Sequence, residues 1–492
     1  MIIVGGGVAG LAAGIYGQKA GFDTVIYEKH SIAGGECTGW DRQGVHIDGC
    51  IHWLTGTKPG TTLYNMWVEA GALGDVEIYQ PDVISTLEYE GQSLKLYRDL
   101  DKLRAHLVEI SPDDEQEIQR LCKHIKSFYQ FQIPCEKPLD TMNLLDKVKL
   151  GLSMKDVGPA MNALSKITLA EYLGRFKSPI IRKALAVGLH ETNSAYILPF
   201  TLATSISGNG GRPAGGSRAM AKRMEDKYKS LGGELILNQE VKEIVVRDTT
   251  AEGVILGSND FVKGDYVVPT CDISVTYDQL LKGKYQDPQF AKMYSNAEDY
   301  PLMSCVYMSF VVDADLSDYP ADLVFQTTPF AYEDSVLDQI SIKHYCYEPS
   351  FAPAGKSVVV AYLNANYEWW KQARQNMDQY KTAKVTLASA LMDRLGTRFP
   401  ELQGKIGLLD AATPITYERY CGAYKGAWMS FGSTPRGKRI THNGRIPGID
   451  NLYMGGQWLM PPGGLPAALV TGKWAVQRLC ARAKDNRKML RN

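Results

Sequence analysis

The sequence lacks the features that define several protein classes. It has no apolar run near the ~18 residues that a membrane-spanning helix requires, and its first apolar run is too short for a signal peptide. Lysine plus arginine and aspartate plus glutamate each number 54, so the net charge is zero and gives no electrostatic footprint for nucleic acid. We therefore expect a cytoplasmic protein with no nucleic-acid partner.

Cysteine is scarce and scattered. The chain has nine cysteines, an odd number, and no C-x-x-C pair. This usage argues against a disulfide framework and against a cysteine-based zinc site, and we predict no metal ligands. Cys37 and Cys50 are interpreted as small buried packing residues rather than redox thiols, because free cysteine is often buried for packing.

The N-terminal stretch contains the motif that most clearly indicates a binding site. An apolar strand runs into glycines spaced G-x-G-x-x-G at Gly5, Gly7 and Gly10, an Ala-rich helix follows, and a second apolar strand ends at Glu28. In this pattern the glycines allow a tight turn, close approach of a pyrophosphate and close helix packing, and the acid binds a ribose. We predict a dinucleotide site that disfavours NADP; the alternative is a glycine-rich turn without a ligand.

The residues after Glu28 indicate which dinucleotide is bound. Gly34-Gly35-Glu36 follows the acid, and such a pair resembles the FAD-binding signature of flavin oxidoreductases that include amine oxidases and phytoene desaturases. That family usually has Arg or Lys where this chain has Glu36. Two later stretches, about 210–245 and 455–468, resemble phytoene desaturases, carotenoid isomerases and retinol saturases, so the resemblance covers essentially the whole chain.

This resemblance implies the fold. It is α/β, with a glutathione-reductase-like, Rossmann-type FAD-binding domain interleaved with an α+β substrate domain. The FAD domain would comprise 1–80, 200–272 and 441–492, and the substrate domain 81–199 and 273–440.

The resemblance also implies the FAD contacts. Val241 would touch the adenine end through its backbone, and a helix starting near Leu465 would point its N-terminus at the flavin. Gln457 stands where amine oxidases often have an acid. The implied cofactor-binding residues are Gly5, Gly7, Val8, Ala9, Gly10, Glu28, Lys29, Gly34, Gly35, Glu36, Val241, Gly456, Gln457, Gly464, Leu465 and Pro466.

The implied activity is hydride transfer between flavin N5 and a C–C bond of an apolar polyene, isoprenoid or lipid-like substrate, as desaturase, saturase or isomerase. His52 and Tyr424 are the candidate proton donors; the alternative for His52 is a packed side chain beside Trp53. Two other functions stay open: an amine or alcohol oxidase that releases peroxide, and a prenyl- or lipid-binding chaperone without catalysis.

The segment from about 140 to 187 is predicted to be helical. In the related desaturases this region can touch the membrane, and its apolar residues alternate with Lys147, Lys149 and Lys155. Peripheral membrane contact and a domain helix with a solvated lysine face are both open. The sequence names neither the electron acceptor nor the oligomeric state.

Overall fold

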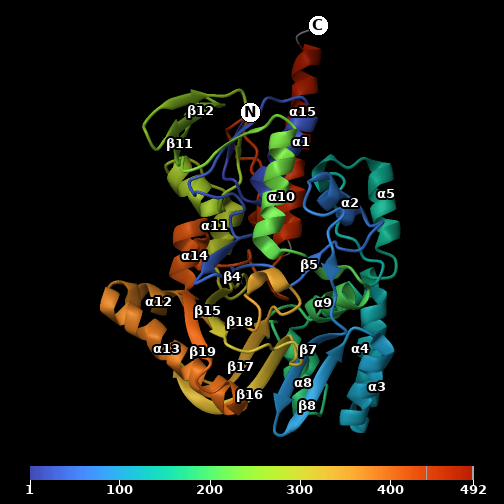
Figure 1. Ribbon diagram of the computed structural model, residues 1–492. Coiled ribbons are helices and arrows are strands. Elements are labelled where there is room, and N and C mark those ends of the chain that lie inside the picture. Colours follow the sequence, from blue (N-terminus) through green and yellow to red (C-terminus); the bar gives the residue numbers. More distant parts are fainter. Residues whose placement is uncertain (439, 490–492) are drawn as a thin grey trace.

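The N-terminal strand lies inside a short parallel sheet. We describe a computed structural model that covers residues 1–438 and 440–489 (Figure 1). The sheet is formed by β1 (Ile2–Val4), β2 (Val25–Tyr27), β10 (Glu234–Ile236) and β14 (Val267–Pro269). Its strand order is β10-β2-β1-β14 and every pairing is parallel. The strands are mostly buried and apolar, which is typical of parallel sheets covered by helices.

Three helices pack around this sheet and join distant parts of the chain: α1 (Val8–Lys19), α10 (Gly216–Ser230) and α15 (Leu465–Met489). α1 packs against both α10 and α15. The contact with α15 is so close that a Cβ on Gly472 would lie 2.3 Å from the carbonyl oxygen of Ala9. Glycine at this position therefore lets the last helix of the chain lie against the first.

A small antiparallel sheet caps the same end of the molecule, at the top of Figure 1. It consists of β11 (Val241–Arg247), β12 (Thr250–Leu256) and β13 (Phe261–Lys263). Val241, at the start of β11, is buried in the core that also holds Ile2 and Val4 of the parallel sheet. The position of this capping sheet is thus fixed by shared apolar packing.

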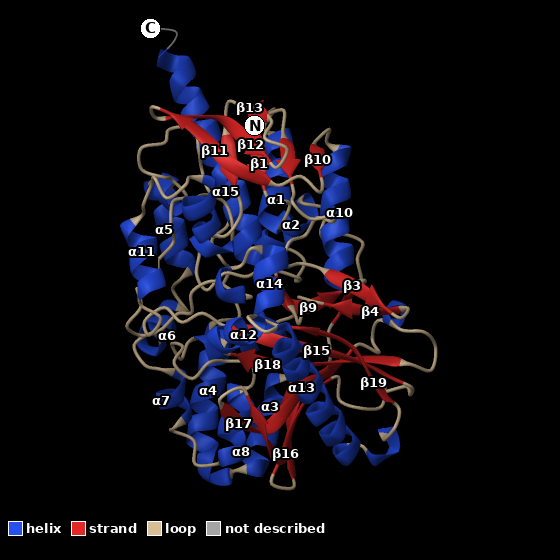
Figure 2. Cartoon of the chain, turned by 90° about the vertical axis from the view of Figure 1, so that its left-hand side faces the viewer, coloured by secondary structure: helices blue, strands red, loops and turns tan. Residues whose placement is uncertain are grey.

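A large mixed sheet forms the other end of the molecule, as both views show (Figures 1 and 2). Its order is β19-β15-β18-β17-β16-β7-β8, and only the β16–β7 pairing is parallel. β7 and β8 form a hairpin at one edge of this sheet. The strands are β7 (Val83–Tyr89), β8 (Gln92–Tyr97), β15 (Ser304–Val312), β16 (Asp322–Tyr332), β17 (Ser335–His344), β18 (Ser357–Ala365) and β19 (Ile406–Ala412).

Helices pack on this sheet in two groups. α12 (Tyr367–Arg374) and α13 (Met377–Arg398) lie near β16 and β19. By contrast, α3 (Leu100–Ile110) contacts β8, and α8 (Pro179–Ala186) contacts β7 and β8. The second group belongs to a largely helical region with its own apolar core. The remaining helices are α2 (Thr62–Glu69), α4 (Glu115–Ser127), α5 (Leu144–Ser153), α6 (Gly158–Leu164), α7 (Leu169–Leu173), α9 (Ile197–Ile206), α11 (Pro288–Ser295) and α14 (Pro414–Cys421).

Helix α5 differs from its neighbours because none of its residues is buried. Leu144, Leu145 and Leu152 are 77%, 71% and 68% exposed, and Val148 is exposed as well. At 100° per residue these four side chains occupy one face of the helix. Within the described residues, no helix is both long enough and apolar enough to cross a bilayer.

Two small sheets connect the layers. One pairs β3 (Gly39–Arg42) with β4 (Val45–Asp48), and the other has the order β5-β9-β6, built from β5 (Leu54–Thr55), β6 (Ile78–Tyr79) and β9 (Gly210–Pro213). The sequence predicts a glycine turn within residues 210–217, before a helix. The turn lies at Ala214 and Gly215, directly before α10, whereas residues 210–213 form β9. A Cβ on Gly211 would lie 2.3 Å from Ile78, so glycine permits this strand pairing. The two-domain division stays a prediction, and residues 490–492 of its last segment lie outside the described residues.

Candidate active site

The first glycine loop is shaped for close backbone approach. Gly5 has a φ of +100°, which side chains rarely allow, and a Cβ on Gly10 would lie 1.9 Å from the Gly5 carbonyl oxygen. α1 then begins at Val8, and its N-cap Gly7 makes no side-chain capping bond. The amide groups of the first helical turn, at Val8 and Ala9, are therefore available to an anion such as a pyrophosphate.

Glu28 connects this loop to the end of β2. Its carboxylate accepts a hydrogen bond of 2.6 Å from the Gly6 amide and one of 2.8 Å from the His30 amide. Glu28 is also buried and lines the cavity described below. The carboxylate thus lies at the position where an acid after the second strand of a Rossmann unit binds a ribose.

The second glycine pair lies directly against the first loop. The Gly34 amide donates to the Gly6 carbonyl at 2.9 Å, and Gly7 and Gly34 form an isolated parallel bridge. Gly34 and Gly35 have φ values of +120° and +61°. A Cβ on Gly34 would lie 2.4 Å from the Cys37 carbonyl oxygen, so neither backbone conformation nor space admits a side chain there.

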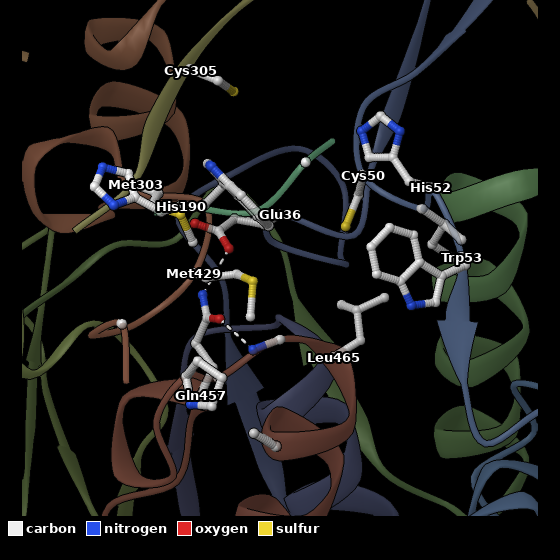
Figure 3. Close-up of a pocket in the computed structure, with 18 of the residues that line it drawn as sticks. Glu36, Cys50, His52, Trp53, His190, Met303, Cys305, Met429, Gln457 and Leu465 are labelled. Atoms are coloured by element: carbon white, nitrogen blue, oxygen red, sulfur yellow. Dashed lines mark hydrogen bonds between the residues drawn. The ribbon is translucent and has the colours of Figure 1, made fainter. Parts of the chain in front are cut away.

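The C-terminal loop reaches the same place. Gln457 donates through Nε2 to the Glu36 carboxyl at 2.8 Å and accepts at Oε1 from the Gly464 amide, also at 2.8 Å (Figure 3). Gly456 and Gly464 both have positive φ values. Gln457 therefore fixes the start of α15 against the segment after the first glycine pair.

The three stretches that resemble the flavin family, residues 5–35, about 210–245 and 455–468, all contribute residues to one cavity of about 1910 Å³. Every predicted cofactor residue lines it except Gly10, which lies behind the first loop. A typical ligand pocket measures roughly 300–1,000 Å³, so this cavity has room for a dinucleotide and a second ligand. The closely packed glycines of the first loop, the Glu28 carboxylate at the end of β2 and the free amide groups at the start of α1 fit FAD.

Two acids in this cavity have perturbed acidities. Burial raises the pKa of Glu36 to about 8, although the Gln457 hydrogen bond partly opposes this effect. Burial also raises the pKa of Asp272 to about 6, against hydrogen bonds from Ser274, Tyr294 and the Tyr424 amide. At pH 7 the Glu36 carboxyl is thus mostly protonated, and it replaces the basic residue usual at this position with a neutral group.

His52 lies on the wall opposite Glu36 and Gln457, beside Cys50 and Trp53 (Figure 3). Its ring centroid is 5.0 Å from that of Tyr362. Burial, assisted by the positive charge of Lys343, lowers the pKa of His52 to about 3. The imidazole is therefore neutral at physiological pH, and any proton that it donates comes from the neutral ring.

Tyr424 lines the cavity at a different point. Its backbone amide donates to the Asp272 carboxyl at 2.8 Å, and its ring packs edge-on against Tyr294 with the centroids 4.6 Å apart. Both candidate proton donors thus face the cavity. Their catalytic roles stay predictions.

A buried charged cluster behind His52 was not predicted from the sequence. Arg212 pairs with Asp322 and donates to the His52 carbonyl at 2.8 Å. Lys343 is fully buried, its ammonium lies 3.4 Å from the Ile51 and His52 carbonyl oxygens, and burial lowers its pKa to about 7. These residues are far apart in the sequence and carry no local signal that could have predicted the cluster.

The fold and the cavity together define a flavin-dependent oxidoreductase. The chain belongs to the family described as flavin containing amine oxidoreductase, whose model matches residues 8–480. This match confirms the family resemblance, and with it FAD as the cofactor and the enzyme class. The open alternative of a chaperone without catalysis is therefore set aside.

Curated relatives match nearly the whole chain at low identity. A chloroplastic prolycopene isomerase from Daucus carota is 23% identical over 98% of this chain and 80% of its own length. An all-trans-retinol 13,14-reductase from Danio rerio is 24% identical, with coverage of 97% and 86%. A lycopene-forming phytoene desaturase from a Paracoccus species is also 24% identical, with coverage of 97% and 96%.

Solved structures show the same fold. An oxidoreductase from Methanosarcina mazei is similar with a TM-score of 0.61 and 16% identity, covering 97% of this chain and 99% of that one. Wild-type putrescine oxidase bound to putrescine gives a TM-score of 0.61 at 13% identity, with 98% of both chains covered. The predicted α/β fold with a Rossmann-type FAD-binding part is confirmed.

Proposed function

We propose that the enzyme oxidises, reduces or isomerises C–C bonds of an apolar isoprenoid-like or lipid-like substrate. FAD supplies the chemistry, by accepting or donating a hydride at flavin N5. The three glycine loops, Glu28, Lys29 and Gln457 would hold the cofactor, and Val241 would contact its adenine end. The observation that carries the proposal is that one cavity continues from these loops into an apolar region.

The apolar region explains the choice of substrate. It lies between the large sheet and the helical region, and aliphatic and aromatic side chains from both line it, together with polar groups such as Arg182 and Thr201. A long hydrocarbon would bury its surface there at a gain of about 25 cal/mol per Å². Its walls include Ile84, Leu96, Phe131, Met161, Leu173 and Ile197.

The charged cluster behind His52 disfavours an amine substrate. Arg212 and Lys343 place two basic groups near this wall, whereas Asp322 contributes a single carboxylate that is already paired with Arg212. A protonated amine would lose its hydration on entering and, among the residues that the structure describes, would meet no unpaired carboxylate at this wall. For this reason we favour C–C chemistry over the amine oxidase activity suggested by the family description.

The chain's own residues would position the substrate and exclude water. His52 and Tyr424 are the proposed proton donors to the carbon skeleton, His52 as a neutral imidazole. The buried Arg212 and Lys343 hold the His52 backbone carbonyl, which keeps the ring against Tyr362. These roles require hydrogen-bond reach to the substrate, which a complex with substrate would show.

The proposal is tested by anaerobic reduction of the FAD-loaded protein. The purified protein is mixed with polyenes, retinoids, unsaturated lipids, steroids and amines, and the flavin absorbance is followed. We expect bleaching by an apolar C–C substrate and a product that has lost two hydrogens. For a saturase or isomerase, the chemically reduced protein should instead yield a product that has gained two hydrogens or is an isomer.

The opposite pattern would contradict the proposal. Bleaching by amines or alcohols alone, with peroxide released in air, would assign the enzyme to the oxidases. The Glu191 and Glu418 carboxylates, which also line the cavity, would then be the first groups to examine as partners of a cationic substrate.

We also propose peripheral membrane contact through α5. Its apolar face is exposed, and Lys147 and Lys149 lie at the two sides of this face. Lysines in these positions suit an anionic lipid surface, and a membrane would be the source of an apolar substrate. The location would be cytoplasmic, which agrees with the scattered cysteines of the sequence, which are odd in number.

A further inference from the structure

Cys37 lies two residues before β3 and Cys50 lies two residues after β4, so the two cysteines flank the β3–β4 hairpin. Gly39 pairs with Asp48 and Arg42 pairs with Val45, and the Gly49 amide continues the ladder by donating to the Thr38 carbonyl at 2.9 Å. Extending this register by one step sets Cys37 opposite Cys50. Across a non-hydrogen-bonded antiparallel pair, Cα atoms are about 4.5 Å apart, within the range of disulfides.

The electrostatics of the two thiols agree with this register. The neighbouring Cys37 thiol raises the pKa of Cys50, and the Cys37 thiol lies 3.4 Å from the Ser217 carbonyl oxygen. Cys37 is fully buried, whereas Cys50 is partly exposed to the cavity that it lines (Figure 3). A small reagent in the cavity can therefore reach the Cys50 thiol, whereas the Cys37 thiol is buried.

The surrounding chain holds this arrangement in place. The Gly34 backbone packs so closely on the Cys37 carbonyl oxygen that a Cβ on Gly34 would collide with it. The Asp48 carboxylate accepts hydrogen bonds from the Cys50 amide at 3.1 Å and from the Ser217 hydroxyl at 2.6 Å. Both cysteines therefore sit on anchored backbone. Packing alone would require neither that two thiols face each other nor that one of them opens onto the cavity.

We propose that Cys37 and Cys50 form a reversible dithiol–disulfide couple in the wall of the FAD cavity. The oxidant is a small disulfide. The Cys50 thiolate attacks one of its sulfurs and releases one thiol, and Cys37 then displaces the second thiol. One S–S bond of the reagent breaks, one S–S bond forms between the residues, and the two protein protons leave on the two released thiols.

The couple is tested on FAD-loaded protein by counting thiols, without turnover. The protein is incubated with hydroxyethyl disulfide, denatured, alkylated and mapped by mass spectrometry. We expect nine alkylated cysteines before treatment and seven after it, with Cys37 and Cys50 linked and their alkylation restored by a reductant. Because burial and the neighbouring thiol raise the pKa of Cys50, the reaction should be faster at pH 9 than at pH 7.

Internal controls are present in the same chain. Cys122 and Cys135 are buried in separate apolar cores and should stay alkylated throughout. Cys37→Ser should leave Cys50 as a mixed disulfide with the reagent, and the wild-type map decides the matter if this variant does not fold. The proposal is overturned if wild-type Cys50 stops at the mixed disulfide, if both thiols stay free at pH 9, or if other cysteines pair instead.

Discussion

The Glu36 carboxyl and the Gln457 side-chain amide are 421 residues apart in the sequence and 2.8 Å apart in the structure. Gln457 also accepts a hydrogen bond from the Gly464 amide, so one side chain joins the segment after Gly35 to the start of α15. The two loops are thus held together by a carboxyl–amide pair.

Glu36 should make the cofactor-free protein less stable as the pH rises. Its folded pKa of about 8 lies above its ordinary value of 4.5, so the unfolded chain binds fewer protons between these two values. The free energy of unfolding should therefore fall from pH 4.5 to pH 8, by up to a few kcal/mol. Denaturant titration across this range should show a shallower slope for Glu36→Gln.

Asp272 contributes to the same pH dependence, since its pKa is also raised, to about 6. Its effect should be complete by about pH 6, and Lys343, whose pKa is lowered to about 7, acts in the opposite direction above pH 7. The difference between Glu36→Gln and the wild type from pH 6 to pH 8 therefore reports on Glu36. An unchanged slope in Glu36→Gln over that interval would show that Glu36 ionises normally.

Gly10→Ala should prevent FAD loading. The new Cβ would lie 1.9 Å from the Gly5 carbonyl oxygen, and a backbone atom there cannot move without displacing α1. We expect a loss of about 3 kcal/mol or more in stability, together with a low ratio of flavin to protein absorbance. Gly151→Ala is the matched control, because nothing lies within 4 Å of its Cβ, and alanine should stabilise α5 by up to ~1 kcal/mol. Equal flavin loading in both variants would contradict the model of the loop.

His52 should stay neutral throughout the physiological range. Its pKa is lowered to about 3 by burial and by Lys343, so NMR of histidine-labelled protein should show no protonation of His52 above about pH 4. His344 is the internal contrast, because hydrogen bonding to the Cys346 side chain and to the Tyr319 carbonyl raises its pKa despite burial. A His52 resonance that titrates near pH 6.5 would restore the imidazolium as a proton donor.

Removing the two most exposed leucines of α5 should weaken membrane binding. Leu144→Ser combined with Leu145→Ser should lower co-sedimentation with anionic vesicles by about tenfold or more, since each buried leucine is worth roughly 1.5–3 kcal/mol. A double variant at Val336 and Val385, which are exposed on other elements, is the control. Equal losses in both double variants would remove α5 as the contact.

Filling the apolar region should impair turnover without touching the cofactor. Ile197→Trp, at the start of α9, would occupy space between the helices and the sheet. We expect the KM for the apolar substrate to rise by about tenfold while the flavin spectrum is unchanged. Val385→Trp on α13 should have no effect, and a normal KM in Ile197→Trp would place the substrate elsewhere.

The sequence predicted the parts of the site that depend on local backbone. The spacing of Gly5, Gly34 and Glu28 follows from the geometry of a strand, a turn and a helix, so these residues can be recognised in the sequence. The cluster of Arg212, Asp322 and Lys343 could not be found in this way, because its members meet only when the large sheet packs behind His52. The facing of Cys37 and Cys50 also needed the structure, since the register of a short hairpin fixes it.

The close packing of α15 against α1 sets a limit on assembly during synthesis. Ala9 and Glu36 can make their contacts with Gly472 and Gln457 only after the C-terminal part of the chain has been synthesised. At about 5–20 residues per second, the 421 residues between Glu36 and Gln457 take roughly 20–85 s to translate. The cavity wall that Glu36 and Gln457 form is therefore completed only late in synthesis, and loss of α15 should leave the Gly5–Gly10 loop exposed.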